Sequence, residues 1–237
     1  NNTTVTIERD SASRVIHFGE RFLIEKLPVG TRVVYPPPPL PGLLDIDGAI
    51  RAALDKPIGC DPLSSQLKAG MKVTIAVDDV SLPLPPMASP DIRARVIQVL
   101  MEMLSHHGVD DVHVIMAIGL HRRMKPDEIA HAVGPRVFRA LGRSWLYNHD
   151  AEDPTGMLIL ERDEGGFPIA ISQRAATSDL LIYVNINFVP MNGGHKSVGV
   201  GLSSYETISA HHNPHVMNKT DSYMVPERSE LHRSFDR

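Results

Sequence analysis

The densest group of potentially reactive side chains lies between Asn185 and Pro214, in the stretch NINFVPMNGGHKSVGVGLSSYETISAHHNP. Lys196 follows two glycines and a histidine, and a pair of histidines comes near the end. A lysine that is removed from water has a lowered pKa, and its neutral amine can then anchor a ligand covalently. Neutral imidazole is a ligand for nickel, copper, zinc or iron. We therefore interpret this stretch as the active-site segment.

The glycines before Lys196 do not make a P-loop for nucleotide phosphates. The pattern GxxxxGK[ST] requires a glycine where Pro190 or Met191 stands. Glycines at this place would nevertheless let a ligand approach the backbone closely. Covalent anchoring by the lysine therefore remains the chemistry that the stretch favours.

The paired histidines, His211 and His212, are expected on a helix that begins at Ser203 or Ser204. Adjacent side chains on a helix point about 100° apart, so we expect that the pair does not share one metal. One of the two remains a candidate ligand. His215 is a weaker one.

Polar side chains also follow the predicted strands. Asp78 and Asp79 come directly after the apolar run 72–77, and His121 follows the run 112–118. The aspartates would bind a metal or a ribose, or simply cap a loop. The histidine would be a general base near neutral pH, or a surface or helix-capping residue. His149, after a third strand around 145–147, is interpreted as structural.

Strand and helix patterns alternate from residue 72 onward. Helices are predicted from Ser89 as cap and Pro90 as first residue to Gly108, and from Pro126 through Ala132 to a stop at Gly134, with a helical tract over 137–141. A hairpin is expected to turn at Gly165 and Gly166, before a fourth strand over 180–184. This order predicts an α/β fold with a mostly parallel, Rossmann-like sheet of βαβ units, whose chemistry lies beyond the carboxyl ends of the strands.

The first part of the chain has a different pattern. Residues 1–35 alternate apolar and polar side chains, which predicts a small antiparallel β element with half-buried strands. The proline-rich residues 36–42 are interpreted as a stiff extended connector. Residues 43–237 are then the α/β core, in which Asp47 is expected to cap the first helix.

Composition excludes several classes of protein. The net charge of −4 comes from 24 basic and 28 acidic residues spread along the chain, which argues against a nucleic-acid partner. One cysteine, Cys60, excludes an internal disulfide and fits a reducing cytoplasm; we expect it to be a small buried residue without a catalytic role. Apolar runs are too short to span a membrane, so a cytoplasmic protein is predicted.

Several motifs, in the same order, resemble the nickel-dependent lactate racemase family. They are AIRAALDKPIG, the strand end VDD, the turn IGLHRRM, YNHDAEDP, and GGHKSVGVGLSSYETISAHHNP. The resemblance covers most of residues 1–237 and implies the N-terminal catalytic domain of a two-domain protein. Because the chain starts on Asn1 and stops on SELHRSFDR, we expect it to be a piece of a longer protein whose C-terminal domain closes over the site.

The resemblance implies a role for each matching residue. Lys196 would hold a pyridinium-derived nickel pincer mononucleotide covalently through a thioamide, and His212 would be the protein ligand to nickel. Asp79 and Ser81 are assigned to cofactor binding, with Asp79 at the nucleotide end. His121 would take the hydroxyl proton of a 2-hydroxy acid while the α-hydride moves to the pyridinium ring. A planar 2-keto acid would form, and return of the hydride to its other face would invert the centre.

Two positions depart from the family pattern. The family's second catalytic histidine corresponds to Ile186, which is flanked by asparagines that cannot act as bases. Leu82 stands where the pattern DDxTRPTP has an arginine, so a cofactor phosphate would lose a bidentate partner. Arg122 or Arg123 is the candidate replacement.

The sequence leaves three functions open. The first is a racemase or epimerase of a 2-hydroxy acid. The second is a related protein that binds a nucleotide or metal without turnover, and the third uses the same cofactor for net redox or elimination chemistry on a larger hydroxy acid. The covalent lysine and the metal-binding histidine favour an enzyme, whereas Ile186 favours the third function over the first. The identity of the substrate and a homo-oligomeric state are also left open.

Overall fold

The computed structural model describes residues 3–19, 21–80, 89–163, 165–186, 194–222 and 224–236. The chain divides into two compact units, residues 1–44 and 45–237. Each unit is described by itself. Within the described residues, no helix is both long and apolar enough to cross a membrane.

The first unit consists of two small antiparallel sheets. Strand β1 (Thr4–Thr6) pairs with β4 (Arg32–Val34), and β2 (Arg14–Phe18) pairs with β3 (Arg21–Glu25). These strands confirm the predicted antiparallel element. The expectation of half-buried strands is wrong, because most strand residues of this unit are exposed. A unit of this size has too little chain to cover both faces of two short sheets.

The second unit contains a parallel sheet, as the sequence predicted. In its described part the strand order is β10–β5–β6–β7, and all three pairings are parallel. The strands are β5 (Lys72–Val77), β6 (Asp111–Met116), β7 (Leu146–Asn148) and β10 (Leu180–Val184). The two middle strands are nearly continuous apolar runs, since helices cover both of their faces.

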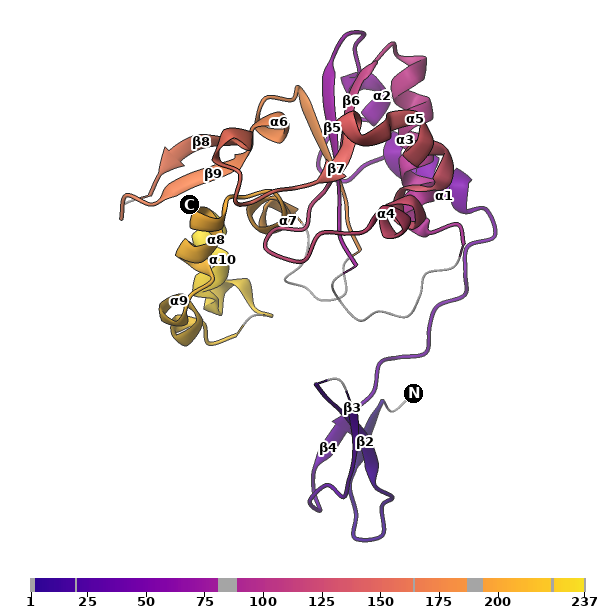
Figure 1. The fold of residues 1–237 in the computed structure, drawn as a ribbon. Coiled ribbons are helices and arrows are strands. Elements are labelled where there is room, and N and C mark those ends of the chain that lie inside the picture. The colour runs from indigo at the N-terminus through magenta and orange to yellow at the C-terminus, as the bar shows by residue number, and fades with distance from the viewer. Residues whose placement is uncertain are drawn as a thin grey trace. The chain divides into compact units, whose positions relative to one another are not determined.

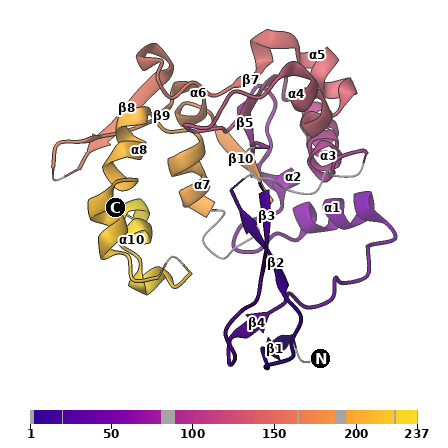
Figure 2. The ribbon, with the colours of Figure 1, turned by 60° about the horizontal axis from the view of Figure 1, so that its bottom comes forward.

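Helices lie on both faces of the sheet (Figures 1 and 2). The side chains of alternate strand residues build two cores, one on each face. The larger core packs Val73, Ile75 and Val114 against the first group of helices. On the opposite face, Ala76 and Ile115 pack against Ala175 and Leu202. The first group is α1 (Ile46–Asp55), α2 (Leu63–Gln66), α3 (Ile92–His106), α4 (Pro126–Val133) and α5 (Pro135–Trp145). The second is α6 (Gln173–Ala176) and α7 (Gly194–Gly201).

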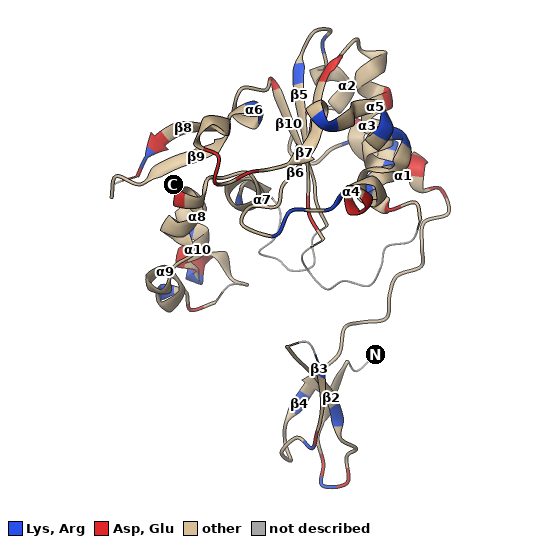
Figure 3. Cartoon of the chain, viewed as in Figure 1, with Lys and Arg blue, Asp and Glu red and all other residues tan. Residues whose placement is uncertain are grey.

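The remaining elements form a layer beside α7. The hairpin of β8 (Met157–Arg162) and β9 (Pro168–Ser172) turns at the predicted glycines. Three short helices follow: α8 (Tyr205–His211), α9 (Pro214–Lys219) and α10 (Glu230–Asp236). Ser204 is the N-cap of α8, which confirms one of the two predicted caps. Basic and acidic residues are interspersed over these elements and the rest of the unit (Figure 3).

Two predicted helix caps are wrong, and so is the predicted burial of Cys60. The cap of α1 is Asp45, whose side chain accepts a hydrogen bond from the amide of Gly48, and not Asp47, which lies in the first turn. The cap of α3 is Asp91, not Ser89, since the Asp91 carboxylate accepts from the Arg93 amide. In each case two capping residues lie two positions apart, and spacing alone does not choose between them. Cys60 is exposed, because it follows the end of α1 in a surface turn.

Candidate active site

The strand order places a switch point at β5, whose two neighbours lie on opposite sides in the sheet and far apart in sequence. Ligands of open parallel sheets bind outside the carboxyl ends of the strands at such a point. Asp78 and Asp79 follow β5, and Ile186 follows β10. The amide of Ile186 donates to Oδ2 of Asp78 at 3.0 Å, which joins the two strand ends.

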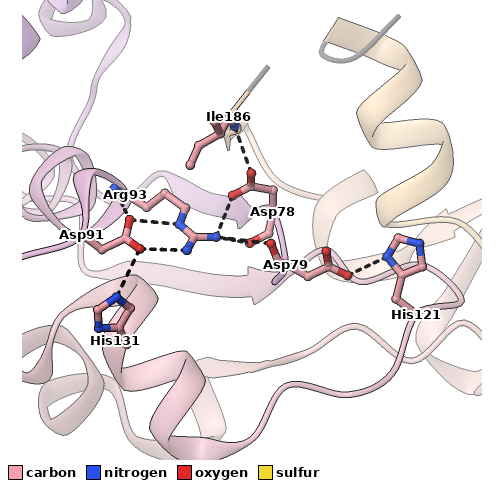
Figure 4. Close-up of polar contacts among 7 residues, drawn as sticks. All are labelled: Asp78, Asp79, Asp91, Arg93, His121, His131 and Ile186. Carbon is pink, nitrogen blue, oxygen red and sulfur yellow. Dashed lines mark hydrogen bonds and ion pairs between the residues drawn. The ribbon is translucent and has the colours of Figure 1, made fainter. Parts of the chain in front are cut away.

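His121 lies in the turn after β6, the strand on the other side of β5, and it contacts Asp79. Its Nδ1 is 2.7 Å from Asp79 Oδ2 (Figure 4). A carboxylate only accepts, so Nδ1–H donates and the neutral ring keeps its lone pair on Nε2. This hydrogen bond raises the pKa of His121, whereas partial burial lowers it. The side chain of His121 is 54% exposed and that of Asp79 11%, so an accessible imidazole rests on a fixed carboxylate.

Lys196 lies on α7, in its first turn within the described residues. Burial lowers the pKa of its amine. The other end of α7 packs closely on the turn that carries His121: a Cβ built at Gly201 would lie 2.9 Å from Ala117 Cβ, and one at Gly119 would lie 2.6 Å from the carbonyl oxygen of Val200. The two glycines thus allow a helix and a strand end to meet without side chains between them.

The rings of His211 and His212 contact each other, with their Nδ1 atoms 2.7 Å apart. His212 is the C-cap of α8, and its backbone angles are not helical (φ −103°, ψ 67°). The two side chains therefore do not diverge as they would inside a helix. Burial lowers the pKa of His211 to about 4, and it also lowers the pKa of His212. Both rings are therefore neutral at pH 7, and one donates to the other.

Electrostatic effects connect candidate residues from three parts of the fold. Besides burial, the positive charges of Lys196 and His121 lower the pKa of His212. The charge of Lys196 also opposes the pKa increase that Asp79 causes at His121. His121, Lys196 and His212 therefore lie near enough for their charges to affect one another.

Other residues singled out in the sequence lie elsewhere or outside the described ranges. Ser81 and Leu82 belong to the segment 81–88, which the structure does not describe. His149 is buried, and its Nε2 donates to the carbonyl of Ser203 at 2.9 Å, which supports its structural interpretation. His215 is exposed in the first turn of α9.

The two arginines proposed as replacements at the cofactor phosphate are both in ion pairs. Arg122 makes a bidentate contact to Glu128 at 2.8 and 2.7 Å. Arg123 pairs with Asp150. Either arginine would have to leave its carboxylate partner to bind a phosphate.

Sequence reasoning missed a buried arginine beneath the site. Arg93, in the first turn of α3, has a side chain that is 5% exposed, and it pairs with Asp91 at 2.8 Å and with Asp78 at 3.2 Å. The sequence signal was an arginine on a predicted helix two residues after an aspartate. Side chains two positions apart do not face each other within a helix, so this spacing gives no indication of a buried ion pair.

A separate cavity of about 420 Å³ lies among β9, α7, α8, α9 and α10. Phe167, Thr207, His211 and Phe235 are among its lining residues. Asp79, His121, Lys196 and His212 are not. His211, which contacts His212, and His215 line this cavity, so it borders the group of candidate residues without including Asp79, His121, Lys196 or His212.

Comparison with known proteins gives relatives of one kind. A lactate racemase from Lactiplantibacillus plantarum is 26% identical over 174 residues, and one from Thermoanaerobacterium thermosaccharolyticum is 23% identical over 189 residues. These matches cover 71% and 78% of this chain. They cover 39% and 42% of the relatives, so the chain spans less than half of their length.

Solved structures share the fold. The lactate racemase apoprotein from T. thermosaccharolyticum superposes with a TM-score of 0.69 at 22% identity, over 95% of this chain and 52% of that one. A protein from Thermotoga maritima superposes with a TM-score of 0.59 at 19% identity, over 81% of this chain and 46% of that one.

The model of the lactate racemase N-terminal domain matches residues 21–224, which include both sides of the switch point and all of α7 and α8. Since this match covers most of the chain and the fold agrees with it, the chain belongs to the lactate racemase N-terminal domain family.

Proposed function

We propose that this chain is the catalytic domain of a racemase or epimerase that acts on a 2-hydroxy acid by reversible hydride transfer to a lysine-anchored nickel pincer nucleotide. The observation that carries the proposal is the hydrogen bond that orients His121 on Asp79, in a site whose electrostatics also involve a partly buried lysine, Lys196, and a neutral histidine, His212. The family to which the chain belongs supports the reaction class. The C-terminal domain of the same protein and the small hydroxy acid are the proposed partners.

The donor set fits a metal that arrives within an organic cofactor. Among the described residues, no three His, Cys, Asp or Glu side chains are arranged to hold a metal ion. One protein ligand suffices if the cofactor supplies the others, and His212 is neutral at pH 7, as a ligating imidazole must be. If His212 Nδ1–H donates to His211, then Nε2 of His212 has the free lone pair.

Lys196 has the properties that covalent attachment requires. Its amine is partly buried, and the resulting decrease in its pKa increases the fraction of neutral, nucleophilic amine. Its place on a helix fixes the direction of the side chain better than a loop would. Once bound, the cofactor would supply the hydride acceptor that no side chain can provide.

His121 is the proposed acid and base. Because Asp79 accepts from Nδ1–H, Nε2 is the atom that takes the proton from the substrate hydroxyl and later returns it. Asp79 also stabilises the imidazolium that forms, in the manner of the aspartate in a catalytic triad. The role of Asp79 at the nucleotide end and that of Ser81 in cofactor binding stay predictions.

A second candidate function follows from Ile186. Its side chain has no proton to exchange, and its backbone amide is held by Asp78. Inversion requires the bound 2-keto acid to present its other face before the hydride returns, and Ile186 supplies no base for the hydroxyl in that second orientation. Release of the keto acid is net redox chemistry, which leaves the hydride on the cofactor and so would need an external hydride acceptor for turnover. Neither this release nor elimination from a larger hydroxy acid needs the second orientation.

The decisive experiment measures intact mass and nickel content of the chain produced together with the enzymes that make the cofactor. We expect a mass increment and about one nickel per chain in the wild type. Lys196→Ala should lose the increment, whereas Lys219→Ala, a lysine on α9, should keep it. An unmodified wild-type chain under these conditions would refute the proposal.

The loaded protein then separates the two candidate functions. Exchange of the substrate α-hydrogen with loss of optical rotation is expected from a racemase or epimerase. Accumulation of a keto acid or of an eliminated product would favour the second function. His121→Ala should abolish either reaction and keep the nickel, and activity that survives this change would refute the role of His121.

A further inference from the structure

A guanidinium group is buried against the turn that carries Asp79, the hydrogen-bond partner of His121. Arg93 is 4% exposed as a residue, and the side chain of its partner Asp91 is fully buried. The pair is held by a fork: Arg93 Nε and Nη2 donate to the two carboxylate oxygens of Asp91 at 3.1 and 2.8 Å. A buried pair without this geometry would be strongly destabilising, so its satisfied hydrogen bonds are essential.

The third nitrogen of Arg93 reaches the end of β5. Nη1 donates to the carboxylate of Asp78 at 3.2 Å, to the carbonyl of Asp78 at 3.2 Å and to the carbonyl of Asp79 at 3.4 Å (Figure 4). The other oxygen of the Asp78 carboxylate accepts from the Ile186 amide. One guanidinium thus connects the start of α3 with the ends of β5 and β10.

The hydrogen bonds from Arg93 Nη1 to the carbonyls of Asp78 and Asp79 hold the backbone of this turn. Asp79 has no regular secondary structure to hold it, since β5 ends at Val77. Its carboxylate must nevertheless meet an imidazole that is more than half exposed. The Asp78 amide donates to the carbonyl of Val184 at 3.2 Å, and the contacts from Arg93 to both carbonyls hold the next peptide groups, from which the Asp79 side chain extends toward His121.

We propose that Arg93, oriented by Asp91, is a positioning residue that holds the Asp78–Asp79 turn so that Asp79 stays hydrogen-bonded to His121. Arginine is required because a lysine ammonium is a single point of donation and cannot span two carboxylates and two carbonyls in one plane. The importance of this role for turnover rests on the proposed function. The positioning itself is a property of the protein without cofactor or substrate.

The test is the pKa of His121, measured by NMR titration of its ring protons in the cofactor-free protein. Arg93→Lys keeps the charge, so it changes the position of Asp79 without removing a cation. We expect the pKa of His121 to fall in this variant, in the direction of the fall in Asp79→Asn. In the double variant Arg93→Lys/Asp79→Asn, the arginine change should add nothing to the effect of Asp79→Asn, because both remove the same hydrogen bond.

A second variant separates positioning from direct electrostatics. Arg93→Gln removes a positive charge, which by itself would raise the pKa of a nearby histidine. Loss of positioning would lower it. A fall therefore supports the proposal, and a rise or no change in a folded variant overturns it. Asp79 and Lys196 also affect the pKa of His121, and the charge of His121 affects the pKa of His212. All three residues are unchanged in the single variants Arg93→Lys and Arg93→Gln.

The matched control is Arg95→Lys, on the same helix. Arg95 makes a surface ion pair with Asp47 and should leave the pKa of His121 unchanged. Circular dichroism would establish that each variant is folded. In the wild type, the Arg93 guanidinium protons should give separate, slowly exchanging signals, and averaged signals like those of Arg95 would also overturn the proposal. None of these readouts requires cofactor loading, so they are independent of the mass and nickel experiment.

Discussion

Asp79 determines two properties of His121 through a single hydrogen bond. It fixes the tautomer, because the carboxylate can only accept and so keeps the proton on Nδ1. It also raises the pKa of the ring, since the carboxylate stabilises the charged form. A base needs a free lone pair and an acid needs a proton, so the same contact affects both halves of a reversible proton transfer.

Replacing Asp79 by asparagine tests this dependence. The pKa of His121 should fall, because a neutral amide stabilises imidazolium less than a carboxylate does. The acidic limb of the pH–rate profile of the loaded protein should then move to lower pH, since His121 must be deprotonated to act as a base. The maximal rate should fall by roughly 10²-fold, as is typical when a catalytic group loses its orientation. An acidic limb that stays in place would show that another group is responsible for it.

The hydrogen bond between Asp79 and His121 was not predictable from the sequence. The sequence did indicate that both residues follow buried strands, which places them at the same edge of the sheet. Whether their side chains meet depends on the strand order and on the path of each turn. For Asp79 that path depends on Arg93, which the sequence gave no reason to single out.

Among the elements, α7 both carries Lys196 and packs against the turn that carries His121. Its C-terminal half lies against the turn after β6, where Gly119 donates to the carbonyl of Gly201 at 3.0 Å. The two glycines therefore set the distance between the helix that carries Lys196 and the turn that carries His121. The glycines before Lys196 predict space for a ligand. Gly201, after Lys196, instead makes space for a neighbouring strand end.

Gly201→Ala should disturb this packing. The new methyl group would lie 2.5 Å from the hydroxyl oxygen of Tyr183 and 2.9 Å from both Ala117 Cβ and the Ala117 carbonyl oxygen. We expect a loss of about 1–3 kcal/mol in the free energy of unfolding, as for other overpacked cores. Urea denaturation would measure it. Gly42→Ala, where a Cβ meets nothing within 4 Å, is the control and should stay within about 0.5 kcal/mol of the wild type.

Helix boundaries show where local patterns suffice and where they do not. The glycine stops predicted for α3 at Gly108 and for α4 at Gly134 follow from capping rules; α3 ends at His106, with Gly108 directly after its C-cap. The starts of α1 and α3 were wrong because neighbouring residues compete for the cap. At α3 the cap is the aspartate that also binds Arg93, and the burial of Arg93 against Asp78 is a tertiary contact that local spacing does not contain.

For the whole molecule, buried neutral histidines couple stability to pH. His149 is buried, and desolvation lowers its pKa below the ordinary value of 6.5. Between these two pKa values the unfolded chain binds a proton that the folded chain does not. Stability therefore rises with pH in this window and is lost as the pH falls below about 6.5. His113, His211 and His212 act in the same direction.

His149→Gln tests the share of one of these histidines. Glutamine cannot be protonated, so the change in unfolding free energy between pH 7.5 and pH 5 should be smaller in this variant. Each proton that distinguishes the two states contributes up to about 1.4 kcal/mol per pH unit. Denaturant titrations at the two pH values would measure the difference. An equal pH dependence in both proteins would mean that His149 is protonated without cost in the folded state.

The strand order also has a consequence for how the protein is made. Asp78 and Ile186, whose contact joins β5 to β10, are 108 positions apart in the chain, and the anchor lysine comes later still. A contact of this range forms after the local helices and the β5–β6 pair, because closing a long loop costs entropy that only the finished sheet offsets. We therefore expect the Asp78–Ile186 contact to form late in folding, so that the proposed attachment at Lys196 would take place on a folded apoprotein.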